Sequence, residues 1–323
     1  MLGLRDLDGT VAEAIRAEDG FPPDWTDFDE LETVADDRIA AFRRRRREAA
    51  RDRGPTWGLR DAVDRVVRTD RDEYIDRPDV DEEKKLEAVR ELHRMNQVLG
   101  SYEVFADVLS YVADGVRERE DRDDDGGEGR DCGVAVLELA SGYGEFALEL
   151  ERTGRADEDG IAVTGSDVVP RYVAEANERA EREGLATRFV ELDALALGPT
   201  AIASAAADTP GATGDPDVVF VAQSVHHFSP GQLARMVAGA GEVADAFVAI
   251  DGRRTARVLG FLGPMAAVAS RDPLLTHDAV VSSRRLYAEA ELEVLATVAA
   301  PDATITTGAR PPGFTVLDVR FDG

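Results

Sequence analysis

The sequence of 323 residues contains one cysteine, Cys132, and only two lysines, Lys84 and Lys85. A single cysteine excludes a disulfide framework within the chain and a zinc site built from several thiolates. Its 65 acidic residues outnumber the 38 basic ones, which gives a formal net charge of -27. This excess disfavours nucleic acid as a partner, because phosphate binding needs clustered positive charge.

Long apolar runs are also absent. The longest, residues 258–269, is interrupted by Gly260, Gly263 and Pro264. It is shorter than the roughly 18 apolar residues that a membrane-spanning helix needs. The N-terminus does not have the pattern of a signal peptide. We therefore expect a cytoplasmic protein with no membrane span.

The charge composition suggests adaptation to concentrated salt. A large excess of carboxylates with almost no lysine is typical of proteins that stay folded in molar salt, as in halophilic archaea. Such a chain is expected to lose structure at low ionic strength, where its carboxylates repel one another unscreened.

One basic stretch, residues 43–47, consists of five consecutive arginines. Two interpretations remain open. The favoured one is a solvated helix face whose charge is offset by Asp36, Asp37, Glu48 and Asp52. The other is a contact with RNA, which would make the protein an RNA-modifying enzyme.

The hydropathy pattern divides the chain into three parts. Residues 1–118 predict an N-terminal helical cap, with helices over residues 27–50, 85–99 and 102–116. Asp24 or Thr26 is the expected N-cap of the first, and Gly100 is the expected end of the second. Residues 119–131 form an acidic linker, and residues 132–323 form the core domain.

In the core domain, apolar runs of strand length alternate with helical patterns, which predicts an α/β fold with a parallel sheet. An acidic or polar residue follows each strand, at the edge where open α/β sheets bind ligands. The expected strands are residues 134–139, 161–164, 187–192, 217–222 and 246–250.

The first strand leads into a turn of small residues, within the sequence VAVLELASGYGEFAL at residues 134–148. Such a turn lets a ligand approach the backbone, and the helix that follows directs its N–H groups toward the same point. Gly142, Gly144 and Ala147 also satisfy the G-x-G-x-x-G/A fingerprint of dinucleotide sites. The turn alone therefore does not identify the cofactor.

Glu138 is acidic at the end of an otherwise apolar strand, where a structural residue would be aliphatic. The stretch ELASGYGE, residues 138–145, resembles the degenerate E/D-x-G-x-G-x-G motif of class I S-adenosylmethionine-dependent methyltransferases. Ala140 stands where that family usually has its first glycine. The resemblance implies S-adenosyl-L-methionine as cofactor. It also implies a Rossmann-like sheet, mostly parallel with the last strand antiparallel, behind an N-terminal helical domain.

Looser similarities extend this resemblance along the chain. Residues 90–109 are similar to the helical lead-in of small-molecule methyltransferases. FVAQSVHHFSP at residues 220–230 is similar to the segment that follows strand four in that group, and residues 277–292 resemble the helix before its last two strands. The partner implied is a small-molecule methyl acceptor.

Candidate cofactor-binding residues follow the strands. Asp167, 23 residues after Gly144, suits both hydroxyls of a ribose, and a helix N-cap is its alternative role. The resemblance implies that Asp193 accepts a hydrogen bond from the adenine amine beside the N–H of Ala194; a turn aspartate is the alternative. The full predicted set is Glu138, Ala140, Ser141, Gly142, Gly144, Asp167, Val168, Asp193, Ala194, Gln223 and Ser224.

Candidate catalytic residues are His227 and His277, either of which suits a general base for a hydroxyl acceptor. His226 is less favoured. Two adjacent histidines need further ligands to hold a metal, and the only other histidine is His93, so no metal site is predicted.

These features predict a methyltransferase that acts on a small molecule, with O-methylation favoured over C-methylation. One alternative is an NAD(P)-dependent oxidoreductase, although the sequence has no Tyr-x-x-x-Lys pair. Another is a non-catalytic module that binds S-adenosylmethionine. The N-terminal helices and residues 258–269 are expected to close over the acceptor, and a homodimer is left open.

Overall fold

The computed structural model describes residues 4–69, 71, 73–75, 77, 79–123, 133–255, 258, 260 and 273–322. Nearly all of residues 258–269, which were expected to close over the acceptor, lie outside these ranges. So do residues 124–131 of the expected linker. No helix among the described residues is long and apolar enough to cross a membrane.

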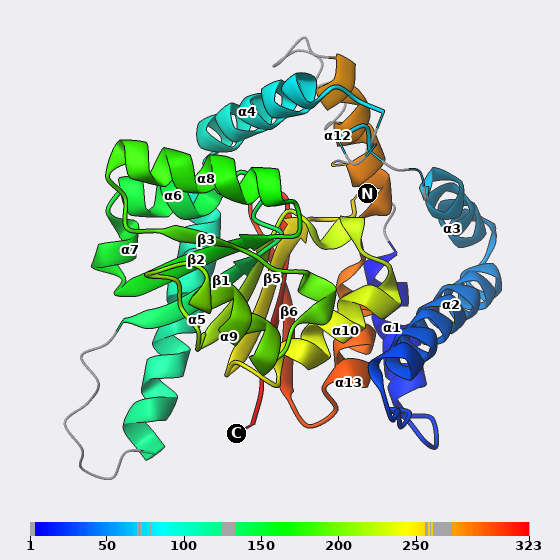
Figure 1. Ribbon diagram of the computed structural model, residues 1–323. Coiled ribbons are helices and arrows are strands. Elements are labelled where there is room, and N and C mark those ends of the chain that lie inside the picture. Colours follow the sequence, from blue (N-terminus) through cyan, green and yellow to red (C-terminus); the bar gives the residue numbers. More distant parts are fainter. Residues whose placement is uncertain are drawn as a thin grey trace.

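The centre of the molecule is a seven-stranded sheet with the order β3-β2-β1-β4-β5-β7-β6 (Figure 1). Strands β1 to β5 run parallel, and β7 is antiparallel to both β5 and β6. This confirms the predicted mostly parallel sheet with an antiparallel last strand. The strands are β1 (Val134–Leu139), β2 (Ile161–Asp167), β3 (Arg188–Glu191), β4 (Val218–Ala222), β5 (Ala246–Gly252), β6 (Thr304–Arg310) and β7 (Phe314–Arg320).

Helices cover both faces of this sheet. The helices that precede β1 in the sequence are α1 (Arg5–Arg16), α2 (Phe28–Asp52), α3 (Pro55–Val67), α4 (Glu82–Leu99) and α5 (Ser101–Asp123). The later helices are α6 (Glu145–Arg152), α7 (Arg155–Glu158), α8 (Pro170–Glu183), α9 (Pro199–Ala207), α10 (Pro230–Ala240), α12 (Pro273–Arg285) and α13 (Glu289–Ala299). Short 3-10 turns η1 (Ala194–Ala196) and η2 (Val225–His227) follow β3 and β4.

Alternate residues of each strand enter two separate cores, because successive side chains point to opposite faces of a sheet. Val219 and Val221 of β4 pack with apolar residues of α1, α2, α10 and α13. Val218 and Phe220 of the same strand pack with residues of α5, α6 and α8. The N-terminal helices therefore belong to both cores: α1 and α2 to one, and α5 to the other.

Several helix boundaries in this region differ from the prediction. The N-cap of α2 is Asp27, whose carboxylate accepts the Glu30 N–H at 2.9 Å, and neither Asp24 nor Thr26 has that role. No helix was expected between residues 50 and 85, but Pro55 occupies the first turn of α3, where its missing N–H costs nothing. Helix α5 extends to Asp123, within the expected linker.

The arginine run of α2 does not form a solvated face. Arg46 is 3% exposed and bonds to Asp61 at 3.0 Å and to Asp64 at 2.6 Å. Arg43 reaches Glu291 of α13 at 2.7 Å, and Arg45 pairs with Glu18. The carboxylates that offset this run come mainly from other helices, because the run lies between α1, α3 and α13. With these arginines bound inside the protein, the RNA interpretation loses its basis.

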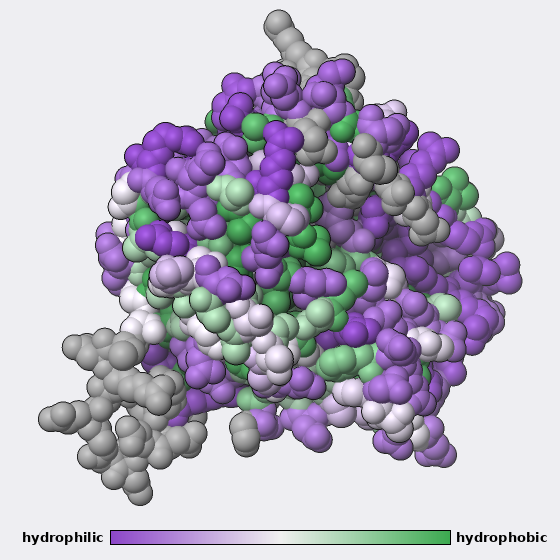
Figure 2. Space-filling model, viewed as in Figure 1, coloured by the Kyte–Doolittle hydropathy of each residue, from purple (hydrophilic) through white to green (hydrophobic). Residues whose placement is uncertain are grey.

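The carboxyl ends of β1, β2, β4 and β5 meet at one edge of the sheet, which α4 and α12 approach (Figure 1). Asn96 of α4 bonds to Gln223 after β4, and Arg285 of α12 donates to the His227 carbonyl at 2.9 Å. Hydrophilic residues cover most of the face seen in Figure 2, in keeping with the net charge of -27. The candidate site lies at this edge.

Candidate functional site

The turn after β1 has a backbone that only a few residue types adopt easily. Gly142 has φ 56° and Gly144 has φ 73°, both in the left-handed region. A Cβ atom on Gly144 would lie 2.3 Å from the ring of Phe189, so residue 144 must be glycine. Ala140 also has a positive φ, 50°, where a side chain is strained. The position that departs from the glycine motif thus keeps the backbone shape that glycine would favour.

Glu138, immediately before this turn, is buried, with 4% of its surface exposed. Its carboxylate accepts the Ala147 N–H, but its Oε2 atom has no hydrogen-bond partner among the described residues. Burial and the nearby Asp167 carboxylate raise the pKa of Glu138 to about 8. A buried carboxylate oxygen without a partner, beside a second carboxylate, suits a cationic ligand such as a sulfonium or an ammonium group.

Asp167, at the end of β2, connects the turn with the start of α8. Its Oδ2 accepts the Gly142 N–H at 2.9 Å, and its Oδ1 accepts the Val169 N–H at 2.9 Å. Each carboxylate oxygen has a second lone pair, so both can still accept a ribose hydroxyl. Burial raises the pKa of Asp167. The neighbouring Val168 is 63% exposed, which leaves an apolar side chain uncovered at the ligand edge.

Asp193 and Ala194 lie at the end of β3, where Asp193 precedes the turn η1. The Oδ1 atom of Asp193 accepts the Leu195 N–H at 2.9 Å, and Ala194 is buried. The geometry of a turn aspartate is therefore present, with the Oδ2 atom left for a further donor. Its role toward adenine stays a prediction.

Gln223 and Ser224 join the end of β4 to the rest of the site. Gln223 has φ 54°, and its Oε1 accepts from the Asn96 side chain of α4 at 2.7 Å. The Ser224 hydroxyl donates to the Ala140 carbonyl at 3.3 Å, which links this loop to the turn after β1. The structure thus brings Gln223, Ser224 and Ala140 together and adds Asn96 of α4, which was not among the predicted site residues.

His226 is buried between two carboxylates at the ends of β4 and β5. Its Nδ1 lies 2.8 Å from Asp251 Oδ2, and its Nε2 lies 3.3 Å from Glu73 Oε1. Burial alone would lower the pKa of His226, but the charges of Asp251 and Glu73 raise it to about 10. This raised pKa favours the protonated imidazole at neutral pH, which argues against His226 as a general base.

The two histidines predicted as bases have different surroundings. His227 is partly buried, and its ring centroid lies 4.4 Å from that of His226. His277 places Nδ1 2.9 Å from Asp278 Oδ1, and its ring lies against Tyr74 with centroids 4.0 Å apart. His277 thus pairs with a carboxylate in the manner of a histidine oriented for base catalysis.

Sequence reasoning missed the contribution of residues 73–75 to this site. Glu73 is 4% exposed beside His226, and the N–H groups of Tyr74 and Ile75 donate to Asp278 of α12 at 2.7 and 3.1 Å. The segment has no periodic apolar pattern that would have marked it. From the sequence, a charged loop residue such as Glu73 is expected to be exposed. Its burial beside His226 follows only from the tertiary fold.

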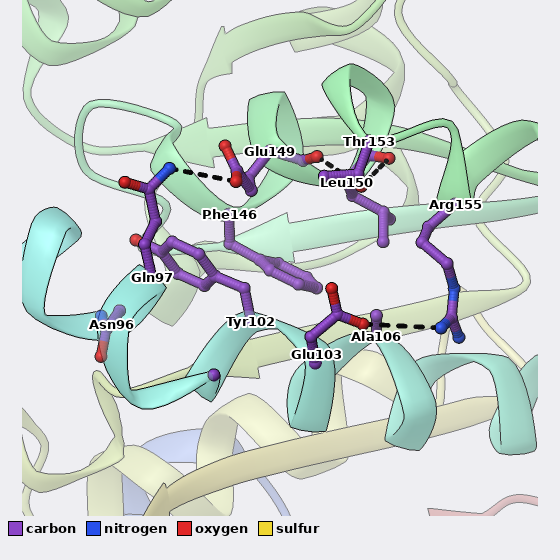
Figure 3. Close-up of a pocket in the computed structure, with 11 residues that line it drawn as sticks. Asn96, Gln97, Tyr102, Glu103, Ala106, Phe146, Glu149, Leu150, Thr153 and Arg155 are labelled. Carbon is purple, nitrogen blue, oxygen red and sulfur yellow. Dashed lines mark hydrogen bonds and ion pairs between the residues drawn. The ribbon is translucent and has the colours of Figure 1, made fainter.

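A separate cavity lies between α4, α5 and α6 (Figure 3), with Phe146 and Tyr102 on its walls. Gln97 donates to Glu149 across it at 3.0 Å, and Arg155 and Glu103 form an ion pair at its other end. None of the predicted cofactor-binding residues lines it. Asn96 alone connects it with the site at the sheet edge.

Comparison with known proteins shows one clear family match. Residues 136–245 match the family described as a methyltransferase domain. Over 62 residues the chain is 44% identical to demethylmenaquinone methyltransferase of Thermus thermophilus and 42% identical to that of Deinococcus radiodurans. These matches cover 19% of this chain, and the chain spans 26% and 24% of the length of the two relatives.

Solved structures resemble the chain more weakly. The PH0226 protein of Pyrococcus horikoshii has a TM-score of 0.39, with 18% identity over 60% of this chain and 84% of that one. Magnesium protoporphyrin IX methyltransferase of Synechocystis with bound SAH has a TM-score of 0.38, with 19% identity over 66% and 83%. A SAM-dependent methyltransferase of Aquifex aeolicus has a TM-score of 0.40, with 16% identity over 59% and 84%.

The match of residues 136–245 to a methyltransferase domain favours S-adenosylmethionine over a dinucleotide, a choice that the turn alone left open. The residues present fit that cofactor: the turn admits a ligand at the backbone, and Glu138 and Asp167 supply carboxylates for a cationic, ribose-bearing molecule. Over residues 136–245 the chain is therefore similar to methyltransferase domains, and its site fits S-adenosylmethionine.

Proposed function

We propose that this protein transfers a methyl group from S-adenosylmethionine to a small-molecule acceptor, with a hydroxyl oxygen as the favoured nucleophile. The observation that carries the proposal is the site at the end of β1. There the left-handed turn at residues 140–144 lies beside two buried carboxylates, Glu138 and Asp167, within the segment that matches the methyltransferase family. A cation that carries a ribose is the ligand that this combination favours.

The proposed cofactor contacts divide along the sheet edge. Asp167 takes the ribose hydroxyls, Val168 lies against the adenine, and Asp193 with the Ala194 N–H meets the adenine edge. Glu138 and residues 140–144 surround the methionine end, together with Gln223 and Ser224 from the loop after β4. The hydrogen bond from Ser224 to the Ala140 carbonyl holds these two loops together.

The chemistry requires little more than alignment and proton removal. Bound S-adenosylmethionine supplies the methyl group, and the electron pair of the broken C–S bond stays on sulfur. The chain must hold the acceptor oxygen in line with that bond and exclude water. His277, oriented by Asp278, accepts the hydroxyl proton, so that alcohol and S-adenosylmethionine become methyl ether, S-adenosylhomocysteine and a proton. His227 is the second candidate for this base.

C-methylation is the second candidate reaction. It is favoured by the local similarity to the two demethylmenaquinone methyltransferases. The two reactions predict different consequences of His277→Gln, because transfer to an oxygen needs a base for the hydroxyl proton. Loss of turnover with unchanged affinity for S-adenosylmethionine would favour O-methylation. Unchanged turnover of a carbon acceptor in that variant would favour C-methylation.

Isothermal titration in molar potassium chloride tests the cofactor assignment first. We expect micromolar binding of S-adenosylmethionine and S-adenosylhomocysteine, and no binding of NADH. Asp167→Ala should weaken both adenosyl ligands at least tenfold, whereas Asp37→Ala, at an exposed position of α2, should leave them unchanged. Binding of NADH alone would contradict the proposal and would indicate that Gly142 and Gly144 bind the pyrophosphate of a dinucleotide.

A further inference from the structure

Three side chains from distant parts of the sequence meet beyond the ends of β4 and β5. Glu73 precedes α4, and His226 and His227 belong to η2. One potential ligand atom of each lies within 4.8 Å of those of the other two. Glu73 and His226 are buried, whereas His227 is partly exposed. Glu73 supplies a third ligand beside the two histidines. The sequence alone did not indicate such a ligand, and for that reason no metal site was predicted.

The spacing of these atoms suits a transition-metal ion. Zinc binds histidine nitrogen and carboxylate oxygen at about 2.0–2.2 Å, so two ligands of a tetrahedral site lie about 3.3 Å apart. His226 Nε2 and Glu73 Oε1 are separated by 3.3 Å. The ligand atom of His227 lies within 4.8 Å of the other two, so this partly exposed side chain has to approach by at most about 1.5 Å to complete the set.

The groups around the cluster are those that orient metal ligands. Asp251 Oδ2 lies 2.8 Å from His226 Nδ1 and also accepts the His226 backbone N–H at 2.9 Å. With Nδ1–H donated to Asp251, a metal that displaces the Nε2 proton would bind the lone pair on the side that faces Glu73. The Ser282 hydroxyl of α12 donates to Glu73 Oε1 at 2.7 Å and fixes that carboxylate. A histidine held by a carboxylate and aimed at a metal is a recurrent arrangement in zinc proteins.

We propose that Glu73, His226 and His227 bind one divalent transition-metal ion, of which Zn²⁺ is the representative. Two nitrogen ligands favour zinc or a similar ion over magnesium and calcium, which prefer sites made of oxygen. Three protein ligands leave one position open, as in catalytic zinc sites. The site occupies the edge that the sheet presents to a ligand, between the loop after β4 and α12.

A consequence follows for the acceptor, and it rests on the function proposed above. An alcohol or phenol oxygen bound at the open position would lose its proton more easily, because the metal stabilises the resulting anion. The oxygen would then attack the methyl carbon as an alkoxide or phenolate, and the proton would leave to solvent. In this arrangement His227 is a ligand and no longer a candidate base.

The test is metal binding by the full-length protein, freed of metal by a chelator and dialysed into molar potassium chloride. Titration with ZnCl₂ should show one ion per chain, and excess MgCl₂ should not displace it. Co²⁺ in place of zinc should give the visible absorption of a site with nitrogen and oxygen ligands. His227→Gln and Glu73→Gln should each weaken zinc binding at least a hundredfold, and Asp251→Asn should weaken it about 10–100-fold.

His93→Gln is the matched control, because it removes a histidine that contacts Tyr102 and lies outside the cluster. It should bind zinc as the unmodified protein does. His227→Gln keeps the buried His226–Asp251 pair, and a circular dichroism spectrum equal to that of the unmodified protein would show that its loss of zinc is not due to unfolding. Failure of the unmodified protein to bind zinc would overturn the proposal, and so would zinc binding in His227→Gln and Glu73→Gln as tight as in the unmodified protein.

Titration with S-adenosylmethionine separates the two proposals. A protein that binds S-adenosylmethionine but no zinc would contradict the metal site alone. A protein that binds zinc but no S-adenosylmethionine would contradict the proposed function alone, and the metal site would stand.

Discussion

Ala140 keeps a left-handed backbone, φ 50°, at the position where the methyltransferase motif has glycine. This conformation costs an L-residue about 1–2 kcal/mol, which glycine would not incur. Part of that gain is offset because glycine increases the conformational entropy of the unfolded chain. We therefore predict that Ala140→Gly raises the free energy of unfolding by up to about 1 kcal/mol. Ala174→Gly, at an exposed position in α8, should lower it by about 1 kcal/mol. Denaturant titration of the two variants measures the contrast, and equal changes in both would show that the turn is unstrained.

Glu138 makes the stability of the fold depend on pH. Its pKa in the folded protein is about 8, against 4.5 for an ordinary glutamate, so the folded state retains the proton to higher pH. The stabilising effect of that proton is complete below about pH 4.5 and is lost as pH rises through about 8. Glu138→Gln cannot ionise, and at pH 9 it should be more stable than the unmodified protein by about 1–3 kcal/mol.

Unfolding curves at pH 6 and pH 9, without ligand, test this dependence on Glu138. The advantage of Glu138→Gln should be larger at pH 9 than at pH 6. Glu178→Gln, at an exposed position of α8, should behave as the unmodified protein does at both pH values. An advantage of the same size at both values would mean that Glu138 is ionised throughout.

At the scale of elements, α1, α2 and α3 are held together by a buried ionic network centred on Arg46. Its guanidinium bonds to Asp61 and Asp64 of α3 and lies 3.5 Å from Asp8 of α1. Removal of one partner from a buried pair leaves the other charges without compensation. Arg46→Ala should therefore cost about 3–5 kcal/mol of unfolding free energy. Arg44→Ala, at an exposed position of the same run, should change it by less than about 0.5 kcal/mol.

Equal melting temperatures for these two arginine variants would contradict the network. Thermal unfolding followed by circular dichroism is sufficient for the comparison. The two positions share one helix and one residue type, so the difference between them isolates burial and pairing.

The elements that could be predicted from the sequence are those with local signals. Strands β1, β4 and β5 consist almost entirely of apolar residues, and the turn after β1 consists of small residues. The predicted bounds of these strands therefore differ from the observed ones by at most two residues. Helix α1 was missed although Leu7, Val11 and Ile15 have helical spacing. The role of Glu73 could not be predicted, because it depends on a contact with His226 across more than a hundred positions of the chain.

The same distinction explains the arginine run. Its charge and helical location are local properties and were predicted, but its partners were not. Asp61, Asp64 and Glu291 reach it only after α3 and α13 have packed against α2. Composition therefore described the surface of the molecule better than its interior.

At the scale of the whole molecule, the net charge of -27 and the buried ion pairs should respond differently to salt. Raising potassium chloride from about 0.1 M to about 1 M shortens the Debye length from about 10 Å to about 3 Å, so exposed carboxylates repel one another less. The free energy of unfolding should rise over this range. The deficit caused by Arg46→Ala should stay constant, because the buried charges are poorly screened.

Denaturant titrations of the unmodified protein and of Arg46→Ala, at several concentrations of potassium chloride and of sodium chloride, measure how the unfolding free energy of each protein changes with salt. Similar slopes in the two salts would assign the effect to screening and not to one particular ion. Full stability in dilute buffer would contradict the idea that this surface is adapted to salt. A deficit of Arg46→Ala that shrinks with salt would mean that solvent reaches the network. The N-terminal helices would then be held to the sheet mainly by their apolar contacts.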